Sequence, residues 1–229
     1  MNNIIEFKNV SKQYGYTKKL NVLNKINFNF KKGNIYSLVG PSGSGKSTLL
    51  NLLSLIDRPT SGTIRILNNT INYNRSKDND LLRAKRIGII YQENNLLPDF
   101  TALENVYLAR LAISNNKKKA IDDAFTIINK LGISKRKNHF SNELSGGEIQ
   151  RFAISRALIN SPEIILADEP TGSLDFKNAK EVFKILFKLK NANRLIIFAT
   201  HNRYFANMAD CKIELINGKI KIINGRFKK

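Results

Sequence analysis

A glycine-rich segment in the first quarter of the chain has residue types suited to holding phosphate. Residues 40–48 are Gly-Pro-Ser-Gly-Ser-Gly-Lys-Ser-Thr, which fits the P-loop pattern. Glycines let backbone N–H groups close around phosphate oxygens, because side chains would block the approach. We expect Lys46 to reach the β- and γ-phosphates of a nucleotide and Ser47 to ligate Mg²⁺ through its hydroxyl. The residues predicted to bind nucleotide here are Gly40, Pro41, Ser42, Gly43, Ser44, Gly45, Lys46, Ser47 and Thr48.

Two adjacent carboxylates follow an apolar run later in the chain. Residues 164–167 have the composition of a buried parallel strand, and Asp168 and Glu169 come directly after them. A carboxylate at the C-terminal edge of a strand beside a P-loop can hold Mg²⁺, which is the role expected for Asp168. Glu169 would then polarise the water that attacks the γ-phosphate. Alone, the pair would equally fit a solvated strand end, and the P-loop in the same chain favours catalysis.

A third segment has the features of a helix start that could face an anion. Leu144-Ser145-Gly146-Gly147-Glu148 precedes a helical stretch, and Ser145 and Glu148 have capping-box spacing. That spacing by itself predicts an ordinary helix start. The adjacent glycines argue for more, because they would expose N–H groups to an anion as the P-loop does. The chain therefore has two phosphate-type helix ends and one P-loop.

These segments need a sheet and flanking helices to hold them. Alternating patterns and short apolar runs predict strands at residues 4–10, 26–30, 35–39, 60–74, 87–91, 164–167 and 195–199, the fourth after a turn. Helical spacing follows the P-loop from Ser47 to Leu55, predominates at 101–158 and recurs at 182–189. Asn217-Gly218 predicts a hairpin turn. We expect an α/β nucleotide-binding core with a helical subdomain inserted at residues 93–158.

The motifs together resemble the nucleotide-binding subunits of ABC transporters, in the family's order and over essentially the whole chain. The resemblance implies a single ATP-binding domain over residues 1–229, with a P-loop NTPase core of mainly parallel sheet, an antiparallel β subdomain and a helical insertion. It implies that Tyr14 stacks on adenine, that Gln92 senses Mg²⁺ and faces a membrane partner, and that His201 contacts the γ-phosphate. Taken alone, Tyr14 would fit a surface aromatic and His201 a structural histidine.

The resemblance also assigns the second helix end. Leu144–Glu148 matches the family's signature motif, and residues 173–175 match the loop that crosses to the opposite subunit. In this family two subunits pack head-to-tail, and each ATP lies between the P-loop of one subunit and the signature of the other. An ATP-dependent homodimer is therefore implied. The nucleotide-binding residues that the resemblance adds are Tyr14, Gln92, Ser145, Gly146 and Gly147; the implied Mg²⁺ ligands are Ser47, Gln92 and Asp168; the implied catalytic residues are Glu169, His201 and Lys46.

Two stretches resemble one branch of the family in particular. Residues 167–175 are similar to the branch that contains lipoprotein-releasing, macrolide-export and cell-division ATPases, and residues 96–106 look closest to the lipoprotein-releasing system. The latter stretch also fits a helix entry with Thr101 as N-cap and Glu104 at the third helical position. We expect hydrolysis to drive release of outer-membrane-directed lipoproteins from the inner membrane to a periplasmic carrier, with two integral membrane permease subunits. A related exporter or cell-division complex is the alternative.

Some residues depart from that branch, although none touches the phosphate chemistry. They bear on the partner and the substrate, and they are Ile149, Ser173, Asn202 and the stretch 93–95.

The charge balance raises a different function. The chain has 38 Lys and Arg against 18 Asp and Glu, a net charge of +20. Such an excess suits a nucleic-acid or anionic-membrane partner. It also fits a drift of the amino-acid composition toward Lys, Asn and Ile, whose codons are A/T-rich. Soluble ABC ATPases that act on nucleic acid or ribosomes usually have two cassettes, long coiled-coil insertions or zinc cysteines. The sequence has none of these, so no direct nucleic-acid partner is expected.

The location follows from cysteine use and hydropathy. The single cysteine, Cys211, fits a reducing compartment. The N-terminal residues lack a signal-peptide pattern, and no apolar run approaches the ~18 residues that a spanning helix needs. We expect a peripheral protein on the cytoplasmic face of the inner membrane, held there by the membrane subunits.

Overall fold

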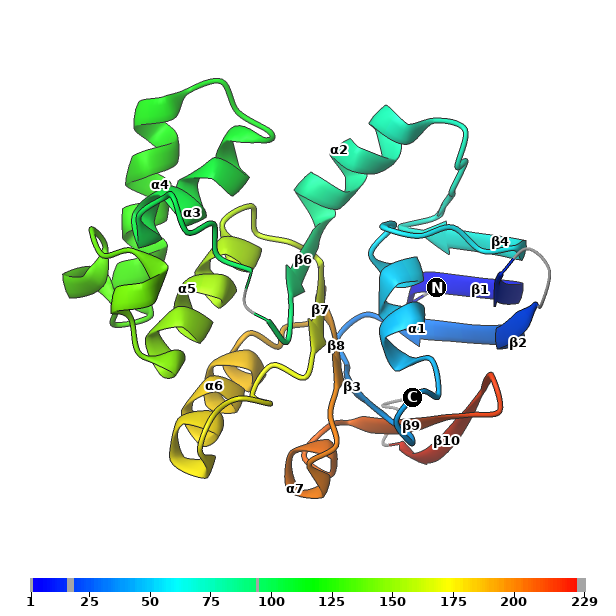
Figure 1. Cartoon of the computed structure of the whole chain (residues 1–229). Coiled ribbons are helices and arrows are strands. Elements are labelled where there is room, and N and C mark those ends of the chain that lie inside the picture. Colours follow the sequence, from blue (N-terminus) through cyan, green and yellow to red (C-terminus); the bar gives the residue numbers. More distant parts are fainter. Residues whose placement is uncertain (1, 16–18, 94, 226–229) are drawn as a thin grey trace. The chain divides into compact units, whose positions relative to one another are not determined.

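The computed structural model describes residues 2–15, 19–93 and 95–225 (Figure 1). Asn94, which belongs to the departing stretch 93–95, lies outside them, as do both ends of the predicted domain. The chain forms two compact units, a first unit of Met1–Asp80 with Lys190–Lys229 and a second unit of Leu81–Leu189. Helix α2, Ser76–Arg86, runs through the point where the chain passes from one unit to the other.

The first unit contains an antiparallel sheet with the strand order β2-β1-β4-β5. Its strands are β1 (Asn3–Tyr14), β2 (Leu20–Lys31), β4 (Ser61–Ile66) and β5 (Asn69–Thr70). Phe7 of β1 is paired with Phe28 on one side and Ile64 on the other. The buried face of this sheet continues into the next one, because the Phe30 ring packs edge-on against Tyr36 with 5.3 Å between centroids.

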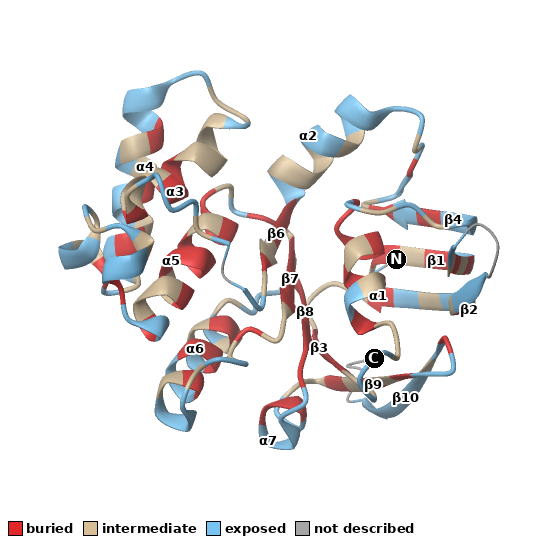
Figure 2. Cartoon of the chain, in the orientation of Figure 1, coloured by how far each residue is buried: buried red, intermediate tan, exposed pale blue. Residues whose placement is uncertain are grey.

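A second group of strands in the first unit holds the P-loop. The order is β10-β9-β3-β8, with β3 (Ile35–Val39), β8 (Leu195–Ala199), β9 (Cys211–Ile216) and β10 (Lys219–Gly225). Strand β3 is parallel to both β8 and β9, and every residue of β8 is buried, as its red colour in Figure 2 shows. Helices α1 (Lys46–Leu53) and α7 (Arg203–Ala206) follow β3 and β8. Cys211, buried at the start of β9, is paired with Tyr36.

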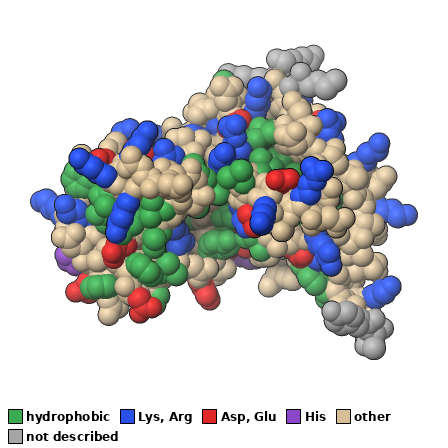
Figure 3. Space-filling model, turned by 90° about the horizontal axis from the view of Figure 1, so that it is seen from above, with side chains coloured by type: hydrophobic (Ala, Val, Ile, Leu, Met, Phe, Trp, Pro, Cys, Tyr) green, Lys and Arg blue, Asp and Glu red, His purple; other side chains and the backbone are tan. Residues whose placement is uncertain are grey.

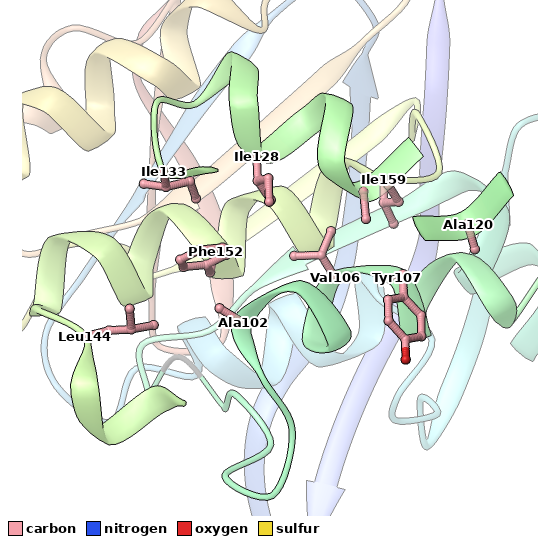
Figure 4. Close-up of a cluster of buried hydrophobic side chains, with 10 residues drawn as sticks. Ala102, Val106, Tyr107, Ala120, Ile128, Ile133, Leu144, Phe152 and Ile159 are labelled. Atoms are coloured by element: carbon pink, nitrogen blue, oxygen red, sulfur yellow. The ribbon is translucent and has the colours of Figure 1, made fainter. Parts of the chain in front are cut away.

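Among its described residues, the second unit contains the end of α2, two parallel strands and four further helices. Strands β6 (Ile87–Ile90) and β7 (Ile164–Asp168) pair in parallel. The helices are α3 (Ala102–Leu111), α4 (Lys117–Lys130), α5 (Gly146–Leu158) and α6 (Phe176–Lys188), with 3₁₀ turns at Ser134–Arg136 and Ser141–Glu143. Val106, Ile128 and Phe152, one from each of α3, α4 and α5, are fully buried in a shared apolar cluster (Figure 4).

The expected fold class is confirmed, since mainly parallel strands, an antiparallel sheet and a helical segment are all present. The Asn217-Gly218 hairpin is also confirmed, and both residues have positive φ, at 50° and 71°. Two helices escaped prediction: α2 buries no side chain among its residues (Figure 2), and α7 has only four residues. The proposed subdomain bounds of 93–158 stay a prediction. None of the described helices is long and apolar enough to cross a membrane.

Candidate nucleotide-binding site

The P-loop ends in a helix start that no side chain caps. Gly45 precedes α1 in the left-handed region, at φ 98°, and within the described residues no side chain bonds to the first-turn N–H groups. These groups carry the positive end of the helix dipole. Gly40 and Gly43 also have positive φ, at 149° and 74°. The loop therefore presents backbone donors in the geometry that binds anions.

Packing on two sides fixes where the loop can accept a ligand. A Cβ added to Gly40 would lie 2.4 Å from the carbonyl oxygen of Leu215, and one on Gly45 would lie 2.7 Å from Cγ1 of Val22. A Cβ on Gly43 would meet no atom of the described residues within 4 Å. The loop is thus wedged between β2 and β9, and it is open at Gly43.

Two side chains of the loop have polar groups directed inward. Lys46 is only 8% exposed, and its Nζ donates to the carbonyl oxygens of Gly40 and Pro41, both at 3.0 Å. The hydroxyl of Ser44 is buried without a partner among the described residues. A buried cation folded across the loop, an orphaned hydroxyl and an uncapped helix end fit a polyphosphate.

Tyr14 lies beside the same helix. Its hydroxyl donates to Oδ2 of Asp57 at 2.8 Å, and the side chain lies near Thr48 in the first turn of α1. Burial, and then the bond to Asp57, raises the pKa of Tyr14, while Thr48 acts in the opposite direction. The ring remains 40% exposed. Tyr14 is therefore anchored by its hydroxyl and keeps ring surface free for a ligand.

His201 lies beside the start of the P-loop. It follows β8 and lines, with Gly40 and Pro41, a pocket of about 420 Å³. Arg203 of α7 and Glu214 of β9 lie on the same pocket. The first unit thus brings together the loop, the aromatic residue and the histidine that the sequence singled out.

The second unit brings Gln92 and Glu169 to one edge of its strand pair. Strands β6 and β7 are parallel, so the residues after their C-terminal ends emerge on the same side. Gly172 N donates to the carbonyl oxygen of Glu169 at 3.0 Å. A Cβ on Gly172 would lie 3.6 Å from both Nε2 of Gln92 and Cβ of Glu169. Glu169 itself has φ 43°, which a non-glycine residue adopts only when its surroundings hold it there.

The metal prediction rests on few protein ligands. Among the residues that the structure describes, no three His, Cys, Asp or Glu side chains gather as a metal site. A Mg²⁺ ion takes most of its ligands from phosphates and water and needs only one or two from the protein. A hydroxyl, an amide oxygen and a carboxylate, as in Ser47, Gln92 and Asp168, are oxygen donors of the kind that Mg²⁺ prefers.

The predicted capping box at Ser145 and Glu148 is confirmed. Glu148 Oε2 accepts from the N–H of Ser145 at 2.9 Å, and Ser145 Oγ accepts from the N–H of Glu148 at 3.4 Å. Arg136 pairs with Glu148 at 3.0 Å. These bonds, the backbone bond from Ser145 first, lower the pKa of Glu148. The start of α5 is therefore held rigidly.

The two glycines after Ser145 have a packing role that the sequence did not reveal. A Cβ on Gly146 would lie 3.1 Å from Cδ2 of Leu174, and one on Gly147 would lie 3.2 Å from Oδ1 of Asn178. Both contacts come from the segment around residues 173–175 and the start of α6. The glycines let that segment lie against the start of α5, whether or not their N–H groups also meet a phosphate.

Comparison with known proteins places these features in one family. Residues 23–172 match the ABC transporter family. The lipoprotein-releasing system ATP-binding protein LolD of Rickettsia bellii is 45% identical over 96% of this chain and 99% of its own length. The protein of the same name from Cytophaga hutchinsonii is 41% identical over 96% of this chain and 100% of its own length.

A solved structure agrees with this assignment. The ATP-binding cassette MJ0796, described as a dimer in a post-hydrolysis state with ADP and Pi, superimposes with a TM-score of 0.90 at 35% identity, covering 98% of this chain and 100% of the other. The relatives and the solved structure match nearly the full length of the chain, and the family model matches residues 23–172. The chain belongs to the ABC transporter family, as one of its nucleotide-binding, ATP-hydrolysing subunits.

Proposed function

We propose that this chain supplies the ATPase of an inner-membrane ABC transporter that releases outer-membrane-directed lipoproteins to a periplasmic carrier. The observation that carries the proposal is the likeness to lipoprotein-releasing ATPases over 96% of the chain, at 45% identity to the Rickettsia bellii protein. The likeness spans 99% of that relative, so the two proteins share the segments that would contact partners as well as the P-loop.

The P-loop residues would bind the phosphates of ATP. The N–H groups of the first turn of α1 and the Ser44 hydroxyl would donate to phosphate oxygens, and Lys46 would exchange its carbonyl acceptors for the β- and γ-phosphates. The Tyr14 ring would stack on adenine. Mg²⁺ held through Ser47, Gln92 and Asp168 would neutralise charge on the β- and γ-phosphates. The negative charge of the triphosphate would therefore be balanced largely by this chain's own N–H and hydroxyl donors and by Lys46.

Glu169 and His201 would serve the hydrolytic step. Glu169 accepts a proton from the attacking water, and His201 donates to the γ-phosphate as charge develops there. The turn from Glu169 to Gly172 holds the Glu169 backbone at φ 43°, which fixes where the carboxylate starts. A fixed carboxylate needs little rearrangement to orient water.

Two copies of the chain would form the active unit, with Ser145, Gly146 and Gly147 of one copy facing the P-loop of the other. The dimeric form of the related cassette with ADP and Pi supports this arrangement. Two permease subunits would hold the dimer on the cytoplasmic face of the inner membrane. Direct nucleic-acid binding is not part of the proposal. On the face that Figure 3 shows, the Lys and Arg side chains of the described residues lie scattered among side chains of other kinds.

Replacing Glu169 with Gln tests the hydrolytic assignment. We expect ATP to bind as in the wild type while kcat falls by roughly 10²–10⁴-fold, the usual contribution of a general base. Lys46→Ala should instead weaken binding itself. Glu181→Gln, on the exposed face of α6, is the matched control and should change neither quantity. Wild-type turnover in Glu169→Gln would remove Glu169 from the role of base.

A reconstitution experiment tests the transport assignment. The tagged chain should co-purify from solubilised membranes with two integral permeases, and the complex in proteoliposomes should release an outer-membrane lipoprotein only with ATP. A single permease type would instead favour a macrolide-export relative. Recovery with nucleic acid that stimulates hydrolysis in a salt-sensitive manner would favour the soluble class.

A further inference from the structure

A nearly buried ion pair lies behind Tyr14, and the sequence did not reveal it. Lys12 of β1 is 8% exposed, and its Nζ donates to Oδ1 of Asp57 at 2.6 Å and to the carbonyl oxygen of Arg58 at 2.9 Å. Lys12 therefore has two acceptors in a shielded position. A cation in such a place is retained only with this kind of pairing.

The second carboxylate oxygen of Asp57 holds Tyr14. Oδ2 accepts the Tyr14 hydroxyl at 2.8 Å while Oδ1 is occupied by Lys12. Burial would raise the pKa of Asp57, but the bonds from Lys12, Tyr14 and the N–H of Arg58 outweigh it and lower that pKa. Asp57 is therefore ionised at neutral pH and bridges Lys12 and Tyr14.

Lys12 also occupies one face of the Tyr14 ring. Its Nζ lies 4.7 Å from the ring centroid. Tyr14 as a whole is 40% exposed, and a flat ligand would have to use the ring face opposite Lys12. The ion pair thus sets the ring's orientation as well as its position.

Helix α1 links this anchor to the phosphate loop. The P-loop enters α1 at Lys46, and the chain leaves the helix at Leu53 and reaches Asp57 through a turn in which Asp57 N donates to the carbonyl oxygen of Asn51 at 3.2 Å. The eight-residue helix is about 12 Å long. Its N-terminal end holds the loop and the turn after its C-terminal end holds the Tyr14 hydroxyl. The distance between loop and ring is therefore set by one rigid element.

We propose that Lys12 and Asp57 are positioning residues that fix the Tyr14 ring relative to the P-loop so that the ring stacks on the base of bound ATP. The proposal rests on the stacking role of Tyr14 proposed above. It predicts that the pair contributes to recognition of the base and leaves the binding of the phosphates unaffected.

The test compares a ligand with a base to one without. The double variant Lys12→Met/Asp57→Leu removes both charges together, so neither is left buried and unpaired. We expect the Kd for Mg-ATP to rise about five- to tenfold, which is part of the effect of one base–aromatic stack. Inorganic tripolyphosphate, which has no base, should compete as well as it does with the wild type. Glu6→Gln/Arg65→Met removes an ion pair of 3.3 Å from the same antiparallel sheet and should change neither affinity.

Two further variants separate the possible failures. Tyr14→Phe keeps the ring but loses the bond to Asp57, so it should also weaken ATP binding. This variant provides the test if the double variant does not fold. Tyr14→Ala reports on stacking itself: unchanged ATP affinity there would refute the stacking role and this inference with it. If Tyr14→Ala weakens ATP binding and the double variant does not, only the inference fails. Equal weakening of ATP and tripolyphosphate in the double variant would also overturn it.

Discussion

At the scale of single residues, Gly45 meets two demands at once. Its φ of 98° is costly for any residue with a Cβ, and Val22 lies where that Cβ would be. Gly43 meets only the first demand, because the space beside it is open. A comparison of substitutions at the two glycines therefore distinguishes the cost of backbone strain from the cost of steric overlap within one loop.

Gly45→Ala should destabilise the protein more than Gly43→Ala. Backbone strain costs each variant about 1–2 kcal/mol, and overlap with Val22 adds to that cost only at Gly45. Urea unfolding of the isolated subunit measures the free energy of both. Adding Val22→Ala to Gly45→Ala should recover part of the difference. Equal losses in the two single variants would mean that Val22 moves aside freely.

The capping box of α5 predicts a pH dependence. The folded-state pKa of Glu148 is lowered, first by the backbone bond from Ser145. A lowered pKa means that the stabilisation is present above the unfolded-state pKa of about 4.3 and is lost as pH falls through the folded-state value. The stability difference between wild type and Glu148→Gln should therefore shrink below pH 4.3. Urea unfolding at pH 7, 5 and 3.5 measures it, and a difference independent of pH would contradict the assignment.

At the scale of elements, the entry to α3 is held by one buried amide. Asn105 is 2% exposed, its Oδ1 accepts from the N–H of Leu97 at 2.7 Å, and its Nδ2 donates to the carbonyl oxygens of Leu97, Phe100 and Thr101 at 3.0–3.1 Å. The loop before α3, with its exposed Leu97 and Phe100, is thus fixed by a helix residue. Because the loop is already ordered, a partner that binds these apolar side chains would not have to order the loop on contact.

Asn105→Ala should lower the free energy of unfolding by about 2–4 kcal/mol, because several backbone groups lose a buried partner. Amide hydrogen exchange at Leu97 should become faster in the same variant. Asn129→Ala, at an exposed position of α4, is the control and should leave both quantities near the wild-type values. Unchanged exchange at Leu97 would show that the loop holds its shape without the amide.

The same scale shows what sequence patterns could and could not predict. Strands such as β8 and the N-cap of α3 at Thr101 follow from local apolar runs and capping residues, so they were predicted correctly. Helix α2 was not, because it buries no side chain and leaves no periodic pattern. The Lys12–Asp57 pair joins residues 45 positions apart, and neither residue type nor spacing marks such a contact beforehand. The roles of the site residues were predicted from the order of the family's motifs along the chain. The periodic patterns that predict helices and strands carry no information about those roles.

At the scale of the whole molecule, the net charge of +20 sets a condition for stability. Eighteen acidic side chains cannot neutralise 38 basic ones, so self-repulsion opposes the folded state at low ionic strength. Specific pairs at the surface are weak individually. Added salt screens this repulsion, so it should favour folding at low ionic strength, where the Debye length changes most.

Raising NaCl from about 0.01 to 0.15 M, which shortens the Debye length from about 30 to 8 Å, should raise the Tm of the isolated subunit. Differential scanning calorimetry without nucleotide measures it. A variant with several exposed lysines of α4 changed to Gln, Lys117, Lys118 and Lys130, should show a smaller rise. A Tm that falls with salt would mean that favourable pairs outweigh the excess of positive charge.

The placement of Cys211 has a practical consequence. It is the chain's one cysteine, and burial raises the pKa of its thiol to about 11, so in the native state it is shielded from reagents that attack thiolates. The packing around the start of β9 must open before a reagent reaches the buried sulfur. The rate of alkylation in non-denaturing buffer would then measure how often this part of the molecule opens, with no probe added to the protein. Cysteines introduced at the surface could be labelled selectively, because buried Cys211 would react far more slowly.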